Sequence, residues 1–91
     1  MNFEWDTAKA ERNLRKHSIS FHEAATVFDD ALSMTYYDPD HSMGERRFMT
    51  VGMSSAGRVL VVGHTDRAKK VRIISARKIS TSERRQYEEN D

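Results

Sequence analysis

The stretch "RIISARK", residues 72–78, is the part of the sequence on which the expected fold depends most. Its centre holds two adjacent β-branched residues, Ile73 and Ile74, and such an apolar centre is typical of a strand. Because side chains alternate along a pleated strand, residues 71, 73, 75 and 77 are expected on one face and residues 72, 74, 76 and 78 on the other. The stretch should therefore fill the core with its middle and carry Arg77 to the edge of a sheet.

Working outward from this strand, short links predict its neighbours in the sheet. The link "SAG" contains Gly57, as a hairpin requires, and the link "RAK" before the last strand is equally short. Consecutive strands joined in this way form an antiparallel meander, with the strand at 32–38 on its edge. At the N-terminus, "NFEWD" alternates large apolar and polar residues, which indicates a short strand with one buried face. The expected strands cover residues 2–6, 32–38, 45–54, 57–66 and 70–78.

Capping residues predict where three helices begin. Asp6 stands at the N-cap position of the first helix. Ser20 and Glu23 form an S-x-x-E capping box before the second helix. Ser80 and Glu83 form the same motif before the third. The expected helices cover residues 7–17, roughly 21–30, and 80–90.

Helical spacing of apolar residues predicts which helices contribute to the core. The first helix has only a thin stripe of Ala10 and Leu14, and the third has little apolar content besides Tyr87, so the third is expected to dock lightly. The order β-α-α-β-β-β-β-α places the protein in the α+β class, as a single domain over residues 1–91. The second helix carries the main stripe, which is Phe21, Ala24, Ala25, Phe28 and Leu32.

Composition narrows the class of protein. The chain has 91 residues, a formal net charge of +1 and no cysteine, so disulfides and thiolate metal sites are excluded. The longest apolar run, residues 59–63, is far too short to span a membrane, and the acidic N-terminus does not resemble a secretory signal. We therefore expect a cytoplasmic protein without a membrane partner.

Several conventional catalytic motifs are missing from the sequence. The four histidines, His17, His22, His41 and His64, lack the spacing of a zinc site. His22 lies off the apolar stripe and is expected to be exposed, whereas His64, at a strand end, is expected to be structural. The scattered glycines form no phosphate loop, and no serine lies in a G-x-S-x-G motif. We expect no metal and no cofactor.

Clustered cations remain as the feature that could support a function. In a meander, residues 77–78 lie at the opposite end of the sheet from residues 67–70, so all the clusters cannot form one patch. For any single cation, solvation of a small domain is the simpler explanation. Several cations on one face would instead bind phosphates and stabilise the charge that develops during RNA cleavage. The clusters are Arg12, Arg15, Lys16 and His17; Arg46 and Arg47; Arg67, Lys69 and Lys70; and Arg77 and Lys78.

Four segments together resemble the BrnT family of toxins, in the same order and over nearly the whole chain. The resemblance implies a RelE-like α+β fold, with a four-stranded antiparallel meander, a short N-terminal strand, two helices on the sheet and a C-terminal helix. It implies a metal-independent ribonuclease toxin of a type II toxin–antitoxin system that inhibits translation and growth. The segments are "FEWDTAKAERNLRKHSISFHEAATVFDD", "ERRFMTVG", "GRVLVV" and "RIISARK" with the following "ERRQYE".

The resemblance also implies site residues and partners. Arg47 and Arg77 would bind phosphate, Lys16, His17 or Glu45 would carry protons, and Tyr87 would stack on a base or donate a proton. The partners would be an RNA substrate and a BrnA-type DNA-binding antitoxin, in a heterotetramer that contacts operator DNA through the antitoxin. The family positions matched here are Lys16, His17, Glu45, Arg47, Arg77, Glu83 and Tyr87, and further RNA contacts are expected from Arg15, Arg67, Lys78 and Arg84.

Two alternatives stay open at this point. The protein could be a non-catalytic toxin homologue that acts only as a protein-binding co-repressor. It could also be a small α+β domain whose charges serve only for solvation, and a salt-sensitive affinity for RNA would exclude this second alternative.

Overall fold

The computed structural model describes residues 1–89, and it has the α+β architecture that the sequence predicts. Helices α1 and α2 precede most of the sheet, and α3 follows it, as expected. Residue 90, the last of the helix expected over 80–90, lies outside the described residues. The elements are β1 (Asn2–Glu4), α1 (Thr7–His17), α2 (Phe21–Thr26), the 3-10 turn η1 (Val27–Asp29), β2 (Met34–Tyr37), the 3-10 turn η2 (Pro39–His41), β3 (Phe48–Met53), β4 (Val59–Arg67), β5 (Lys70–Lys78) and α3 (Thr81–Glu89).

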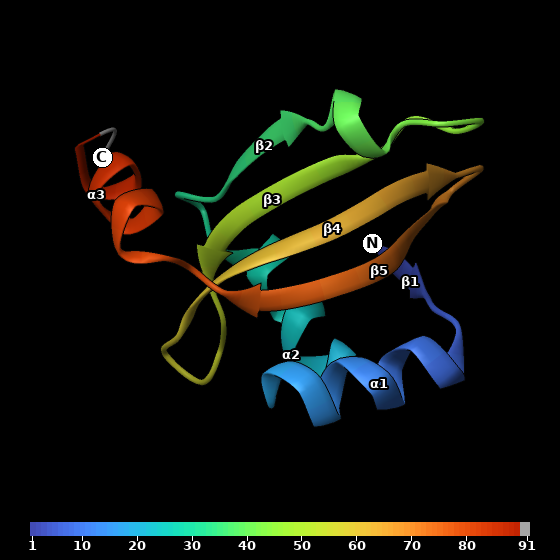
Figure 1. The fold of residues 1–91 in the computed structure, drawn as a ribbon, viewed down its shortest axis with the longest axis horizontal. Coiled ribbons are helices and arrows are strands. Elements are labelled where there is room, and N and C mark those ends of the chain that lie inside the picture. The colour runs from blue at the N-terminus through green and yellow to red at the C-terminus, as the bar shows by residue number, and fades with distance from the viewer. Residues whose placement is uncertain (90–91) are drawn as a thin grey trace.

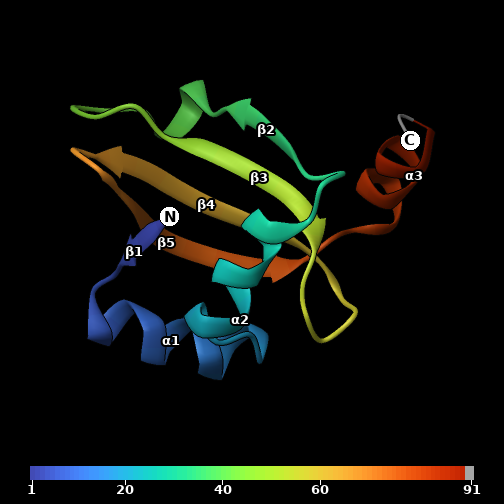
Figure 2. The same ribbon diagram turned by 180° about the vertical axis from the view of Figure 1, so that it is seen from behind.

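All five strands form one mixed sheet in the order β1-β5-β4-β3-β2. Strand β1 pairs with β5 in parallel, and the other neighbours pair in antiparallel fashion. The link between β3 and β4 turns at Gly57, whose φ of 80° lies in the left-handed region that glycine adopts readily. Figures 1 and 2 show α1 and α2 on one side of the sheet, whereas α3 stands apart from them beyond the end of β5. Among residues 1–89, no helix is both long and apolar enough to cross a membrane.

The hydrophobic core lies between the sheet and the segment that contains α2. Two residues of the expected stripes are outside it, because Leu14 is 50% and Leu32 is 59% exposed. The prediction for Leu32 was wrong because the helical spacing stops at η1, so that Leu32 lies in the following turn. Leu14 is exposed because α1 turns a polar residue, Asn13, toward β5. The core consists of Ile19, Phe21, Ala24, Val27, Leu60, Val62, Ile73 and Ala76, and Ala10, Ala25 and Phe28 pack against it.

A β-bulge in β5 changes which of its side chains face the core. Gly63 pairs with Ser75 but the next residue of β4, His64, pairs with Ile73, so Ile74 is the extra residue. The strict alternation expected for residues 71–78 is therefore wrong. An extra residue reverses the alternation beyond it, and Ile73 and Ala76 both enter the core while Ser75 is exposed.

Asn13 of α1 completes the outer edge of β5 where β1 ends. Its side-chain Nδ2 donates to the backbone oxygen of Ala76 at 2.8 Å, and its Oδ1 accepts from the backbone N–H of Ala76 at 3.0 Å. Nδ2 also donates to the oxygen of Ile19 at 3.0 Å. One buried amide thus satisfies backbone groups as a neighbouring strand would.

The expected caps are formed, with one difference. Asp6 accepts the N–H of Lys9 at 3.0 Å, and Ser80 and Glu83 bond each other's backbone N–H groups. Ser20 accepts the N–H of Glu23 at 3.0 Å. The Glu23 carboxylate, however, binds the Arg58 guanidinium, and this contact lowers the pKa of Glu23.

Candidate functional site

A cavity of about 360 Å³ lies where the loop between β2 and β3 meets β3, β4 and β5. Arg47 precedes β3 and Arg77 lies next to the last residue of β5, so the fold brings together two cations that are 30 positions apart in the sequence. We call it the arginine cavity, and its lining residues are Asp38, His41, Arg47, Phe48, Met49, Val61, Gly63, His64, Ile74, Ser75 and Arg77.

Arg77 is held at this cavity by the first turn of α3. Its Nη1 and Nη2 donate to the two carboxylate oxygens of Glu83 at 2.7 and 2.9 Å, which is a bidentate ion pair. The Arg77 guanidinium, together with N–H and hydroxyl donors of Ser80, lowers the pKa of Glu83 to about 2. The same pairing raises the pKa of Arg77. Arg77 is therefore charged and rigidly placed, with its charge partly balanced.

Arg47 is anchored less completely than Arg77. Its Nε is buried without a hydrogen-bond partner within residues 1–89, and its Nη2 lies 3.8 Å from Glu45 Oε1. The other oxygen of Glu45 lies 3.6 Å from Nη2 of Arg67. Glu45 therefore lies between two guanidiniums, and Arg67, expected as a separate RNA contact, joins the Arg47 side of the cavity through it.

Hydrogen bonds close the loop that carries Arg47. Asp38 N–H donates to the oxygen of Arg47 at 2.8 Å, and Arg47 N–H donates to Ser42 Oγ at 2.9 Å. Within the loop, His41 Nδ1 lies 2.8 Å from Asp38 Oδ2. Sequence reasoning missed this pair as a site feature, although the D-x-x-H spacing across a proline turn was a usable signal.

His64 is at the buried end of the cavity. Its Nε2 bonds Thr50 Oγ1 at 2.7 Å, and its ring lies edge-on to Phe28 with centroids 5.0 Å apart. Nδ1 is buried without a hydrogen bond among the described residues, 3.9 Å from Asp66 Oδ1. Burial lowers the pKa of His64, so the ring is neutral and serves as part of the wall. His22, by contrast, is exposed as expected and packs against Trp5.

A second hollow, of about 380 Å³, lies on the other side of the bulged segment of β5. It shares Ile74 and Ser75 with the arginine cavity, and Lys16 and His17 line it. We call it the lysine hollow. The candidate proton carriers at the end of α1 therefore line a hollow that shares part of its wall with the arginine cavity. Its lining residues are Lys9, Arg12, Asn13, Lys16, His17, Ile74 and Ser75.

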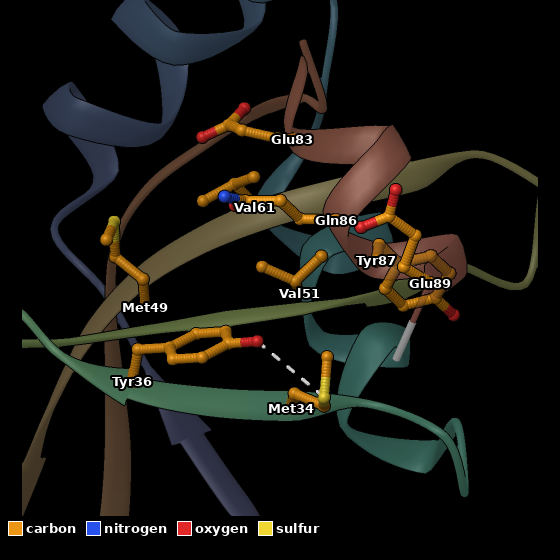
Figure 3. A pocket seen from close by; sticks show the side chains of 9 residues that line it. All are labelled: Met34, Tyr36, Met49, Val51, Val61, Glu83, Gln86, Tyr87 and Glu89. Carbon is orange, nitrogen blue, oxygen red and sulfur yellow. Dashed lines mark hydrogen bonds between the residues drawn. The ribbon is translucent and has the colours of Figure 1, made fainter. Parts of the chain in front are cut away.

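Tyr87 belongs to a third and larger groove, of about 630 Å³, between α3 and the sheet (Figure 3). Its side chain is only 8% exposed, and its hydroxyl donates to Asp30 Oδ2 at 3.4 Å. Figure 3 shows Val51 and Val61 between the strands and α3, so this groove is mainly apolar. Tyr87 is thus not among the residues that line the arginine cavity. The groove is lined by Met34, Tyr36, Met49, Val51, Val61, Glu83, Gln86, Tyr87 and Glu89.

The remaining predicted RNA contacts lie outside these three linings. Arg84 faces Glu88 along α3, with Nη1 3.7 Å from Oε1, and Arg15 and Lys78 are exposed on α1 and at the end of β5. Within residues 1–89, no three acidic or histidine side chains are placed to hold a metal ion. The arginine cavity combines two guanidiniums with two imidazoles, of which that of His41 is exposed and that of His64 is buried. Guanidiniums bind phosphate, and an accessible imidazole can transfer protons.

Comparisons with known proteins agree on one family. Residues 5–83 match the family model described as the ribonuclease toxin, BrnT, of type II toxin–antitoxin systems. The fold is similar to the crystal structure of the Brucella abortus ribonuclease toxin BrnT, with a TM-score of 0.69 and 19% sequence identity over 89% of this chain and 99% of that chain. At this identity the structural match shows a shared fold. A search of curated proteins found no match.

Proposed function

The chain belongs to the BrnT family of ribonuclease toxins of type II toxin–antitoxin systems, and from this premise we propose that it cleaves RNA at the arginine cavity without a metal ion. The observation that carries the proposal is the placement of Arg47 and Arg77 in one cavity. Two guanidiniums at a phosphodiester stabilise the negative charge that grows on phosphorus during cleavage.

The proposed roles follow the positions of the side chains. Arg47 and Arg77 bind the scissile phosphate, and Lys16 or His17, across the bulged segment of β5, carry a proton. Glu45 remains a candidate proton carrier, and its contacts with Arg47 and Arg67 also orient Arg47. Tyr87 would stack on a base or donate a proton only if RNA extended into the groove under α3. Further phosphate contacts would come from Arg15, Arg67, Lys78 and Arg84.

The proposed cellular role is that of a toxin controlled by a partner. RNA cleavage would inhibit translation and growth in the cytoplasm, and a BrnA-type antitoxin would neutralise the toxin in a heterotetramer that binds operator DNA through the antitoxin. The proposal also treats residues 1–91 as one domain related to RelE-like toxins. Co-expression with the product of the adjacent gene tests the pairing. Growth arrest that the neighbour relieves supports it, and a complex without any toxicity supports the non-catalytic co-repressor instead.

Cleavage of RNA by the purified protein is the direct test. We expect the same rate with and without EDTA, because the proposed chemistry uses only side chains. A requirement for added divalent metal would contradict the metal-independent mechanism, and no cleavage together with no growth arrest would contradict the ribonuclease itself.

Two adjacent arginines provide a matched pair for locating the site. The Arg46 guanidinium lies over the Tyr37 and Phe48 rings, 5.5 Å from each centroid, and is not part of the cavity lining, whereas Arg47 is. Arg47→Ala is expected to lower the cleavage rate by about a hundredfold or more, the range for removing one transition-state contact. Arg46→Ala should keep nearly the full rate. Equal losses in the two variants would mean that the cavity is not the site.

A further inference from the structure

The loop between β2 and β3 brings a further proton-accepting group to the arginine cavity. His41 and Asp38 both line the cavity with Arg47 and Arg77, and His41 Nδ1 lies 2.8 Å from Asp38 Oδ2. The roles proposed above use neither residue. An exposed imidazole held by a carboxylate beside two guanidiniums is a chemically active arrangement and calls for a function of its own.

The local backbone fixes this pair in relation to Arg47. The 3-10 turn η2 (Pro39–His41) brings the side chains of Asp38 and His41, three positions apart, to the same side. Ser42 Oγ donates to the oxygen of Asp38 and accepts the N–H of Arg47. Ser42 therefore links the pair to Arg47, the residue just before β3.

The hydrogen bond to Asp38 also decides which nitrogen of His41 can accept a proton. An ionised carboxylate only accepts hydrogen bonds, so Nδ1 of the neutral ring must carry the hydrogen and Nε2 must carry the lone pair. Within residues 1–89, Nε2 of His41 makes no hydrogen bond, and the side chain is 69% exposed, so Nε2 is accessible to a ligand. Carboxylate-oriented imidazoles of this kind act as general bases, and the carboxylate stabilises the imidazolium that forms.

We propose, on the basis of the ribonuclease function proposed above, that His41 is the general base of RNA cleavage and that Asp38 orients it. Nε2 of His41 takes the proton of a ribose 2′-hydroxyl, and the 2′ oxygen forms a bond to the adjacent phosphorus. The bond from phosphorus to the 5′ oxygen breaks, and the leaving oxygen takes a proton from His17 or Lys16. The products are a 2′,3′-cyclic phosphate and a 5′-hydroxyl.

The surroundings of the two histidines in the arginine cavity explain why His41, and not His64, is assigned the role. The titratable and charged groups that line the cavity with His41 are Asp38, Arg47, His64 and Arg77. His64 is buried: its Nε2 is bonded to Thr50, and its Nδ1, which has no hydrogen bond among the described residues, is not accessible at the surface, so neither nitrogen can reach RNA.

The test compares His41→Ala with His22→Ala, an identical change at an exposed histidine outside the cavity. The substrate is a fluorescent oligoribonucleotide, and affinity is measured with its 2′-deoxy analogue, which cannot react. His41→Ala is expected to reduce the cleavage rate by about 10²–10⁴-fold, with unchanged affinity for the analogue. Added imidazole should restore part of that rate. The pH–rate profile of the wild type should show an acidic limb that is missing in His41→Ala, and His22→Ala should behave as the wild type.

Each other outcome has a definite meaning. A His41→Ala rate within threefold of the wild type would overturn the inference, as would a loss that imidazole does not rescue while affinity for the analogue falls. If His41→Ala does not fold, His41→Asn can keep the bond to Asp38 but cannot accept a proton, so it should fold and be inactive. Cleavage by an active His41→Asn variant would overturn the assignment. Absence of cleavage by the wild type would refute the ribonuclease proposal itself.

Discussion

On the face of the sheet that α1 and α2 cover, Leu60 and Val62 are fully buried and Ile73 is 1% exposed, and the contacts are mainly apolar. On the opposite face, Ser75 is exposed and the Arg77 side chain is 41% exposed. The arginine cavity and the groove under α3 lie on this face. The same strands supply both faces, so their alternating residues serve different purposes. The covered face provides the free energy of folding, and the open face presents charge at fixed positions on that rigid support.

The largest effect is expected from removing an aromatic side chain on the covered face. Phe21 is 1% exposed and lies in the core cluster, with its ring edge-on to Trp5. Phe21→Ala should lower the free energy of unfolding by about 3–5 kcal/mol, since it loses apolar burial and leaves a cavity. Urea unfolding measures the change. The control is Met53→Ala on the open face, where Met53 is half exposed and a change within about 0.5 kcal/mol is expected. Similar losses in both variants would erase the distinction between the faces.

The next effect tests a buried polar contact between α1 and β5. Asn13→Ala leaves the N–H and the oxygen of Ala76 without their side-chain partner. Buried backbone groups left unpaired should lower the free energy of unfolding by about 3 kcal/mol. Hydrogen exchange at Ala76 should accelerate as the edge of β5 opens. Unchanged exchange at this amide would show that Asn13 does not secure the edge.

These two residues also show how far sequence reasoning reaches. Phe21 follows the N-cap residue Ser20 and starts an apolar stripe, and such local patterns predicted the class, the helices and the strands. Asn13 carries no local signal, because its partner Ala76 is 63 positions away in the sequence. The bulge at Ile74 was invisible for the same reason: it is a property of the pairing of two strands, and the alternation within one strand does not reveal it.

The residues of the candidate site also fall into two groups: those that the sequence indicates and those whose placement only the fold reveals. Arg47 and Arg77 were selected from the sequence through the family resemblance, but their common cavity depends on the order of β3, β4 and β5 in the sheet. His41 was passed over because its D-x-x-H spacing with Asp38 across a proline turn is a weak signal in a loop that is otherwise not distinctive. Its relation to Asp38 arises from a single 3-10 turn, and its relation to Arg77 from the whole fold.

Two glycines allow the faces to be compared with one identical substitution. A Cβ at Gly52 would lie 2.9 Å from Ser33 Cβ and 3.0 Å from Val27 Cγ1, both in packed surroundings on the covered face. Gly52→Ala should therefore lower the free energy of unfolding by about 2 kcal/mol through overpacking. A Cβ at Gly63 would lie 2.6 Å from Ser75 Oγ, but that exposed hydroxyl can rotate away. Gly63→Ala should therefore change stability by less than about 0.5 kcal/mol. Thermal unfolding of the two variants gives the comparison, and a larger loss at Gly63 would contradict it.

The smallest effect concerns the ion pair that fixes α3 to the open face. The pKa of Glu83 is lowered from 4.5 to about 2, first of all by the Arg77 guanidinium. A carboxylate with a lowered folded-state pKa stabilises the fold above its unfolded value, so the contribution is complete above pH 4.5 and is lost as the pH falls through about 2. Because the Arg77 and Glu83 side chains are 41% and 35% exposed, screening by water limits the contribution to about 1 kcal/mol.

Glu83→Gln tests this contribution with nearly the same side-chain volume. Between pH 5 and pH 2, the wild type should lose about 1 kcal/mol more unfolding free energy than the variant, as urea titrations at each pH would measure. Glu23 and Asp30, whose pKa values are also lowered, are present in both proteins and cancel in the difference. If the unfolding free energies of the wild type and the variant fell equally as the pH is lowered, the pair would contribute nothing to stability.

The variant also leaves Arg77 without its counter-charge, so its affinity for a 2′-deoxy oligonucleotide should rise and become more sensitive to salt. A stability change without this gain would place Arg77 with the structural residues of the fold, and the functional part of the open face would then be reduced to the Arg47 side of the cavity.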